Sequence, residues 1–432
     1  MPVKAKLIVG LGVALAPWLV AMSASADDEV FKATSIVTVA PSLSSSFQPL
    51  ASFDISFVDS SAGVYLLADR SNKAIDVVHT SNNRLFKLLQ PGFVGVVTSP
   101  PNSSGPNGVL TVKKGSGHTE VWAGDGMSRV WVVNLQSGVT LNGGNPISTA
   151  MTPGDQTRAD ELCYDPDDGI VMIANDASSP NPFLTFISTQ TYQVLGHLVM
   201  NGEFPGGTYS GETPPTATPA SGIEQCQYSP RTGKFYVNVP QAPAGNGGAV
   251  DLVLQIDPVS MSILNTVNIT AMGSGCVGNH GMTIGPNRQI ALGCNSGTAS
   301  VIISDKFKND STDEIAPLPN ENGTDENWYN PGDGHYFFAN SGHTPPQLGV
   351  VDAKGDPRQF GPASEDTSAP TASGSHSVAA DSITNQVYVP VNTSVAAQAT
   401  KMCSTNGGID ANGCILVFTT THDDSVAQNS GN

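Results

Sequence analysis

Two histidines, His280 and His376, stand at equivalent positions in a series of similar segments, each at the head of a short apolar strand. The other segments carry an acid or an amide at that position. The full set is Asp54, Asn107, Asp160, Glu224, His280, Asp325 and His376, spaced roughly 45 to 64 residues apart. Imidazoles and carboxylates bind divalent metals and transfer protons near neutral pH. If the fold gathers these side chains, they form a site for metal binding or acid–base catalysis.

The segments that carry these residues are copies of one pattern, seen in "DISFVDSSAGVYLLADRSNKAIDVVHT", "EQCQYSPRTGKFYVNV" and "HSVAADSITNQVYVPVNTS". Each has a short strand, a turn containing Asp, Ser, Pro or Gly, and a strand of aromatic and β-branched residues. An Asn- or Asp-containing turn and a third apolar strand follow. Counting the loosest copy, "NGVLTVKKGSGHTEVWAGDGMSRVWVVNLQSG", there are seven. Repeats of this length are typical of propeller blades, so we predict an all-β, seven-bladed β-propeller. Two β-sandwiches would not produce seven matched copies.

The ends of the repeat region predict how the ring closes. The strand "EVFKATSIVTVA" precedes the first copy, and the last copy ends at "CILVFTTT" without a fourth strand. The N-terminal strand can complete the last blade and so remove an exposed sheet edge. We therefore predict a signal peptide over 1–26, one propeller over 27–422, and a disordered tail over 423–432.

The repeats resemble known propeller groups. The letters "YSPRTGKFYVN" and the Ala-Asn-x-Ser turns are similar to YncE-like, YVTN-type repeats, and "NGVLTV", "HGMTIGP" and "DISFVDSSAGVYLLAD" resemble the SMP-30/gluconolactonase group. That second resemblance implies metal-dependent lactone hydrolysis, with Asn107 in the place of a metal-binding Asn and Asp54 or Asp160 in the place of an acid ligand. The chain departs from this pattern at His280 and His376. A histidine base beside a divalent ion is found in propeller lyases, so elimination is a second implied chemistry.

In a propeller all strand heads lie around the central channel on one face. Carboxylates crowded there raise one another's pKa, which either a bound cation or channel water would relieve. Glu224, His280, Asp325 and His376 come from successive copies and form a ligand set for Mn, Zn or Fe. The all-oxygen arc of Asp54, Asn107 and Asp160 would suit Ca instead. We expect His280 or His376 to serve as a ligand or as the general base for a small-molecule substrate.

A wider ring of Asp and Asn residues follows the second strands. Its members are Asp69, Asp125, Asn175 or Asp176, Asn238, Asn295, Asn340 and Asn392. Such residues favour turns because their side chains bond the local backbone. Asp69, Asp125, Asp176 and His343 are candidates for the pocket rim. The long connections 201–223 and 356–375 directly precede two ring residues and predict a covered site or an inserted segment.

The N-terminus reads as an export signal. Lys4 and Lys6 precede an apolar stretch and an Ala-Ser-Ala site, so we predict cleavage after Ala26 and a periplasmic or secreted protein. In that compartment six cysteines predict disulfides: Cys403 with Cys414, Cys276 with Cys294, and, by remainder, Cys163 with Cys226.

The composition restricts the classes of partner that this protein is expected to bind. The chain has 432 residues and a formal charge of −18, which argues against nucleic acid and anionic membranes. No segment after the signal is long and apolar enough to span a bilayer. We expect a monomer that binds a small molecule, either as a metal-dependent hydrolase or lyase or as a non-catalytic propeller in which any ion is structural.

Overall fold

The computed structural model describes residues 29–115, 117–178, 181–200, 222–243, 249–307, 314–353, 360–361, 364–405, 408–409 and 411–422. The predicted signal peptide, the predicted tail and most of the connection 201–223 lie outside these residues. Within them, no helix has the length and apolar character needed to cross a bilayer.

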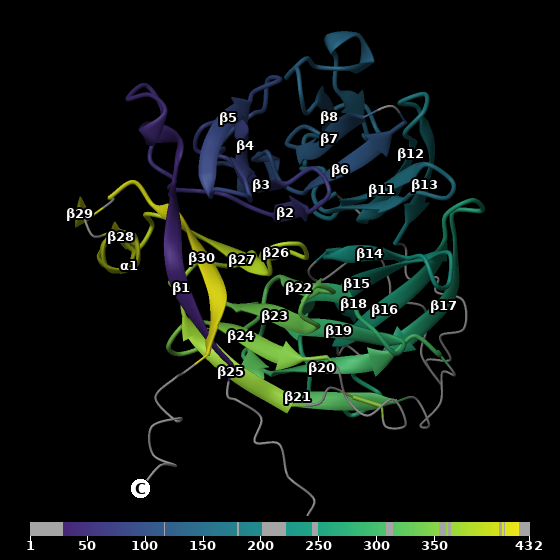
Figure 1. Cartoon of the computed structure of the whole chain (residues 1–432). Helices are drawn as coiled ribbons and strands as arrows, with labels where there is room; N and C mark the ends of the chain where they lie inside the picture. Colours follow the sequence, from purple (N-terminus) through teal and green to yellow (C-terminus); the bar gives the residue numbers. More distant parts are fainter. Residues whose placement is uncertain are drawn as a thin grey trace, which may run out of the picture.

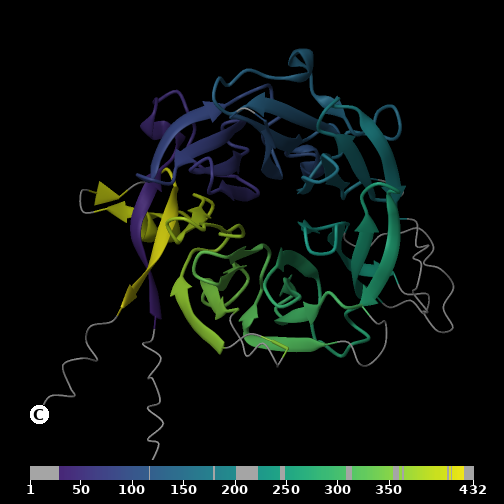
Figure 2. The same ribbon diagram turned by 45° about the vertical axis from the view of Figure 1, so that its right-hand side comes forward.

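Seven four-stranded antiparallel sheets surround a common axis, which confirms the predicted seven-bladed β-propeller (Figure 1). Figure 2 shows the sheets following one another around the ring in chain order. In every blade the first strand in sequence is innermost and the fourth is outermost, except in the blade that contains both ends of the chain.

The first six blades run in sequence order from the innermost strand outward. Blade 1 has β2 (Ser56–Asp59), β3 (Val64–Asp69), β4 (Ala74–His79) and β5 (Arg84–Leu89). Blade 2 has β6 (Val109–Lys114), β7 (His118–Asp125), β8 (Arg129–Asn134) and β9 (Ile147–Ser148). Blade 3 has β10 (Leu162–Asp165), β11 (Ile170–Asn175), β12 (Phe183–Ser188) and β13 (Val194–Val199). Blade 4 has β14 (Cys226–Ser229), β15 (Lys234–Pro243), β16 (Ala249–Asp257) and β17 (Ser262–Asn268). Blade 5 has β18 (Asn279–Ile284), β19 (Gln289–Cys294), β20 (Ala299–Ser304) and β21 (Ile315–Asn322). Blade 6 has β22 (Asn327–Asn330), β23 (His335–Asn340), β24 (Gln347–Asp352) and β25 (Ser364–Pro370).

Blade 7 closes the ring in the predicted way. It joins β26 (Ala379–Asp381), β27 (Gln386–Val391) and β30 (Cys414–His422) to the N-terminal strand β1 (Glu29–Thr38). β1 pairs with β30 from Glu29↔His422 to Thr38↔Cys414, so the two ends of the ring are joined by backbone hydrogen bonds. The helix α1 (Ala396–Met402) and the short strands β28 (Ser404–Thr405) and β29 (Gly408–Ile409) lie in the connection before β30. Three single turns of 3-10 helix, at Ala40–Ser42, Pro101–Ser103 and Asn142–Gly144, complete the regular structure of the described residues.

The hydrophobic core is divided among the blade junctions. The described residues form seven buried clusters, and each joins two neighbouring blades. The cluster between blades 7 and 1, for example, contains Tyr388 and Tyr65, whose rings stack at 4.8 Å. The second strands are packed on both faces, and every residue of β3, β11, β19 and β23 is buried. This explains why the aromatic and β-branched runs in the sequence lack the alternation of a half-exposed strand.

All three predicted disulfides are present. Cys163 pairs with Cys226 between blades 3 and 4, whereas Cys276–Cys294 and Cys403–Cys414 each lie within one blade. No free cysteine occurs in the described chain.

Candidate functional site

The seven predicted strand heads do meet around the axis at one end of the inner strands, here called the upper end. Contacts join heads of successive blades: His280 Nδ1 lies 3.0 Å from Asp325 Oδ1 and 3.9 Å from Glu224 Oε2. Across the point of ring closure, His376 Nε2 lies 3.7 Å from Asp54 Oδ1. We call the set Asp54, Asn107, Asp160, Glu224, His280, Asp325 and His376 the inner ring.

An irregular strand pairing positions these heads. Asp54 N donates to Ala68 O, while Ala68 N donates back to Ile55 O, so two residues of the inner strand oppose one residue of β3. The same arrangement recurs at Asp160 and Glu161 opposite Ala174. In blade 5 it is a register shift between Asn279 and Met282. Such bulges break the alternation of side chains and turn them to new directions. Two consecutive side chains can therefore face the axis.

The arc formed by blades 1 to 3 is held by two arginines. Arg70, in the turn after β3, donates to the Asp54 carboxylate and, at 2.6 Å, to Asn107 Oδ1. Burial raises the pKa of Asp54, but the charge of Arg70 and the bond to His376 outweigh it and bring the pKa to about 2. Asn107 is fully buried, and its amide also donates to Ala159 O.

Arg158 holds the next part of the same arc. Its Nε lies 2.7 Å from Asp160 Oδ2 and its Nη2 lies 2.8 Å from Asp176 Oδ2. Both carboxylates are buried. The oxygen ligands that suggested a Ca site are thus bound to guanidinium groups, which supply the positive charge that the crowded carboxylates require. We call Arg70, Arg158 and their partners the arginine arc.

The arc formed by Glu224, His280 and Asp325, here called the histidine arc, contains no arginine contact of this kind in the described residues. Burial lowers the pKa of His280, but the hydrogen bond to Asp325 and the charge of Glu224 outweigh it and raise the pKa to about 9. Burial, with Asp176 and Asp325, raises the pKa of Glu224 to about 7 against the opposing effect of His280. The side chains of His280 and Asp325 remain 23% and 30% exposed. At neutral pH, Glu224 can therefore exchange its proton while His280 retains its own.

His376 belongs to the junction between the arcs. Its ring stacks on Phe53 at 4.6 Å, and Nδ1 donates to Gly374 O at 2.8 Å. Burial lowers its pKa, but the Asp54 contact and the negative charge of Asp325 raise it overall. Its contact with Asp54, and not with Glu224 or His280, separates it from the four-residue ligand set expected for Mn, Zn or Fe.

The described part of the chain contains no preformed metal cage. Among the described residues, no group of three or more His, Cys, Asp or Glu side chains is arranged to hold a metal ion. The predicted ion therefore remains a prediction, and binding it would require rearrangement of the contacts described above.

The wider ring mostly supports the backbone, as the turn-forming character of Asn and Asp predicts. Asp69 is buried and accepts from Asn72 N, and Asp125 is buried and accepts from Arg129 and Trp131. These two carboxylates therefore do not form a rim. Asp176 is also buried, against Arg158. His343 lines a separate polar hollow of about 360 Å³ beside Glu321 and bonds Pro345 O.

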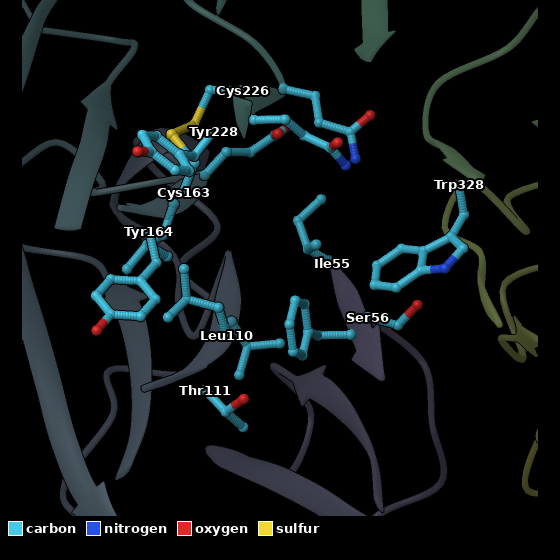
Figure 3. Close-up of a pocket in the computed structure, with 15 residues that line it drawn as sticks. Ile55, Ser56, Leu110, Thr111, Cys163, Tyr164, Cys226, Tyr228 and Trp328 are labelled. Carbon is cyan, nitrogen blue, oxygen red and sulfur yellow. A yellow bond between two sulfur atoms is a disulfide. The ribbon is translucent and has the colours of Figure 1, made fainter. Parts of the chain in front are cut away.

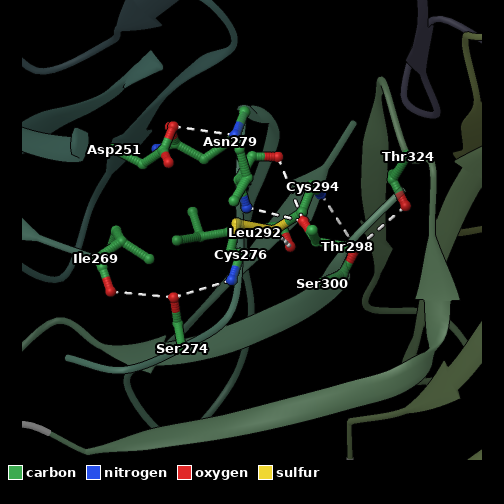
Figure 4. The surroundings of a disulfide bond; sticks show 12 residues. Asp251, Ile269, Ser274, Cys276, Asn279, Leu292, Cys294, Thr298, Ser300 and Thr324 are labelled. Carbon is green, nitrogen blue, oxygen red and sulfur yellow. Dashed lines mark hydrogen bonds between the residues drawn. A yellow bond between two sulfur atoms is a disulfide. The ribbon is translucent and has the colours of Figure 1, made fainter. Parts of the chain in front are cut away.

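Two asparagines of the wider ring act directly on the histidine arc. Asn238 Nδ2 donates to both His280 O and Gly281 O, at 2.9 and 2.8 Å, and so supports the bulge. Asn295 Nδ2 lies 3.1 Å from His280 Nδ1. The disulfide Cys276–Cys294 joins the segment before β18 to the end of β19 and so braces the hairpin that carries His280 (Figure 4). Ser274 Oγ accepts from Cys276 N, and Cys294 N donates to Ser300 Oγ.

A second polar layer, which the sequence pattern does not predict, lies directly below the inner ring. Glu161 and Glu326 follow Asp160 and Asp325 in sequence and hydrogen-bond to each other across the axis. Gln225 follows Glu224; its Oε1 accepts from Met282 N and its Nε2 lies 3.5 Å from Asn327 O. Burial raises the pKa of both glutamates, and a bond between two carboxyl groups requires one proton. We call these three residues the closing layer.

The sequence pattern does not predict the two arginines or the closing layer. Strict alternation along a strand would place the residue after each head on the opposite side, away from the axis, and this applies to Glu161 and Glu326. One signal was available: both are glutamates at the same position of blades 3 and 6. A weaker signal pointed to the arginines, because the whole chain contains only 19 Lys and Arg residues.

Comparisons with known proteins bear on the fold. No family model matches the chain, and no curated protein matches it in sequence. A chain of Kuenenia stuttgartiensis hydrazine synthase is similar in structure, with a TM-score of 0.58 and 14% identity over 87% of this chain and 97% of that one. A chain in the mitotic checkpoint complex gives 0.55 and 10% over 97% and 99%, and the WD40 repeats of RRP9 give 0.52 and 8% over 86% and 95%. At such identities the similarity shows the architecture alone: this chain is a seven-bladed β-propeller.

Proposed function

We propose that this protein binds a small polar molecule at the upper end of its axis and transfers a proton there. The observation that carries the proposal is the histidine arc, in which three titratable side chains from successive blades lie within hydrogen-bonding or ion-pairing distance and stay partly exposed. The reaction classes that fit are hydrolysis of a lactone or ester and elimination from a polar substrate.

Each member of the arc has a distinct role in this proposal. Glu224, with a pKa of about 7, takes a proton from water or from the substrate carbon. His280, with a pKa of about 9, is protonated at neutral pH and donates its proton to the leaving oxygen. Asp325 orients the imidazole through Nδ1. His280 therefore acts as the acid, which revises its expected role as base. His376 contacts the substrate from the neighbouring blade.

The divalent metal stays in the proposal as a further condition. Glu224, His280 and Asp325 would supply carboxylate and imidazole ligands suited to Mn, Zn or Fe. His280 would first have to release its proton and its bond to Asp325. A Ca site in the arginine arc is disfavoured because guanidinium groups already neutralise those carboxylates.

The link to lactone hydrolysis comes from the resemblance to the SMP-30/gluconolactonase group. Two facts weaken it. Asn107, which matches that group's metal-binding Asn, is buried and engaged by Arg70 and Ala159 O. Asp54 and Asp160 are paired with arginines. Membership of that group, or of the YVTN-type group, remains a prediction.

We also propose that the protein is exported. Three disulfides within one propeller are typical of proteins in an oxidising compartment such as the periplasm or the extracellular space. This supports the predicted signal peptide over 1–26, which lies outside the described residues.

A second candidate function is binding without catalysis. It is favoured by the arginine arc, where each charge found among the described groups has a protein partner and needs no substrate to complete it. Such a ring would recognise a ligand by shape and hydrogen bonding and leave it unchanged.

One set of measurements separates the two. Protein purified without an affinity tag is analysed for bound metals and assayed on a panel of lactones, esters and hydroxy acids. Glu224→Gln and His280→Gln should each reduce turnover by about 100-fold or more. The control is His118→Gln, which replaces a histidine at the start of β7 that hydrogen-bonds to Asn134. This substitution should leave turnover unchanged. Turnover that survives both ring substitutions would refute the catalytic proposal; ligand binding without turnover would establish the second candidate.

A further inference from the structure

A cavity of about 240 Å³ occupies the axis below the closing layer. It is lined by residues of the inner strands β2, β6, β10, β14 and β22, and Figure 3 shows these side chains converging on it. Glu161 and Gln225 form its upper end. The closing layer thus separates this cavity from the inner ring, so the two ends of the axis offer two different environments.

The walls of this cavity are unusually aromatic for a chain with only 6% aromatic residues. Trp328 and Phe57 meet edge to face, with ring centroids 5.5 Å apart. Tyr164 and Tyr228 stand on the other side, beside the Cys163–Cys226 disulfide (Figure 3). Tyr228 donates its hydroxyl to Asp167 Oδ2 at 2.7 Å, away from the cavity, and so leaves ring carbon surface facing inward.

The charge of the cavity has one sign. None of the described residues that line it is basic, and Glu161 brings to its upper end one member of a carboxyl pair that keeps a single negative charge when Glu161 and Glu326 share one proton. The chain as a whole carries a formal charge of −18, which attracts cations. Aromatic faces attract cations as well, most strongly Trp, and clusters of aromatic rings recognise substituted ammonium groups.

We propose that this lower cavity is a binding site for a small organic cation of the tertiary or quaternary ammonium class. Trp328 and Phe57 contact the alkyl groups of the ammonium, and the Glu161 carboxyl accepts contact from its positive end. The volume suits such a ligand, because an apolar cavity of about 150 Å³ already admits a benzene molecule in another protein. This site goes beyond the proposed function, which concerns the opposite end of the axis.

The test compares two molecules of the same shape. Isothermal titration calorimetry measures binding of choline and of 3,3-dimethylbutan-1-ol, in which a neutral carbon replaces the ammonium nitrogen. Choline should bind about tenfold or more tightly than the neutral molecule. Trp328→Leu and Phe57→Leu should each weaken choline binding by about tenfold, and Trp328→Phe should retain most of it. Glu161→Gln should weaken choline and leave the neutral molecule unaffected.

The control is Phe86→Leu, which replaces an exposed aromatic residue on β5, far from the inner strands. This variant should bind choline like the unmodified protein. Equal affinity for the two probes would overturn the proposal. So would the absence of choline binding at 10 mM, which is about 100 times a Kd of ~0.1 mM for a weak site. So would unchanged choline binding in a folded Trp328→Leu variant. If that variant does not fold by circular dichroism, Phe57→Leu and Trp328→Phe decide the outcome.

Discussion

The two arcs of the inner ring are alike in sequence position and differ in how their charges are neutralised. In the arginine arc, Asp54, Asp160 and Asp176 are bound to guanidinium groups that stay protonated at any physiological pH. In the histidine arc, Glu224 and Asp325 share an imidazole whose charge depends on pH. A permanent cation makes a carboxylate part of the framework, whereas a titratable cation keeps its neighbours available for proton transfer. On this basis we propose a structural role for the arginine arc and proton transfer for the histidine arc.

The largest expected effect comes from breaking the arginine arc. Arg158→Met removes the cation between two buried carboxylates and should lower the free energy of unfolding by about 2–4 kcal/mol, because an unpaired buried charge is costly. Urea unfolding followed by tryptophan fluorescence measures this loss. The control is Arg84→Met, which replaces an exposed arginine on β5. It should change the free energy of unfolding by less than about 0.5 kcal/mol. Equal effects of the two substitutions would mean that the arc does not support the fold.

The next effect concerns the brace of the histidine arc. Replacing Cys276 and Cys294 together by Ala opens a loop with a sequence separation of 18 and should cost about 3 kcal/mol. Because this disulfide braces the hairpin that carries His280, the imidazole NMR signals should also shift. The matched control is the Cys403–Cys414 pair, whose removal should destabilise the protein without moving those signals. A shift of equal size in both variants would remove the proposed link to the arc.

The pH dependence of stability tests the histidine arc directly. The folded protein keeps the His280 proton up to about pH 9, whereas the unfolded chain releases it near pH 6.5. This contribution is therefore complete below pH 6.5 and is lost as the pH rises through 9. Its size is on the order of 1–3 kcal/mol. Denaturation midpoints from pH 6 to 9.5 should fall more steeply for the unmodified protein than for His280→Gln. Parallel curves would contradict the raised pKa.

The smallest effect is a local change in the arginine arc. Without Arg70, burial dominates and the pKa of Asp54 should rise from about 2 by roughly one to two units or more. Carbon-13 NMR of the carboxyl group in Arg70→Met measures it. The Asp257 carboxyl, whose pKa of about 2 depends on Lys234, should be unaffected. An unchanged pKa of Asp54 would show that His376 and Arg158 hold the low value without Arg70.

The repeats determined the architecture of this protein without any structural information. Seven copies of one strand–turn–strand pattern have to bury their apolar faces against one another, and a missing fourth strand in the last copy is supplied by β1. Cysteine number and position likewise predicted all three disulfides. These inferences succeeded because each depends on local pattern or on simple counting.

Only the tertiary structure decided what surrounds each head residue. The bulges turn the residue after a head toward the axis, and this places Glu161, Gln225 and Glu326 in a layer that strict strand alternation does not predict. Arg70 reaches Asn107 of the next blade from the turn after β3, and Arg158 reaches Asp176 across its own blade from the connection before β10. The sequence alone thus determined that seven polar heads would meet. Their charge state and their availability depend on distances between segments far apart in the chain, and folding alone establishes those distances.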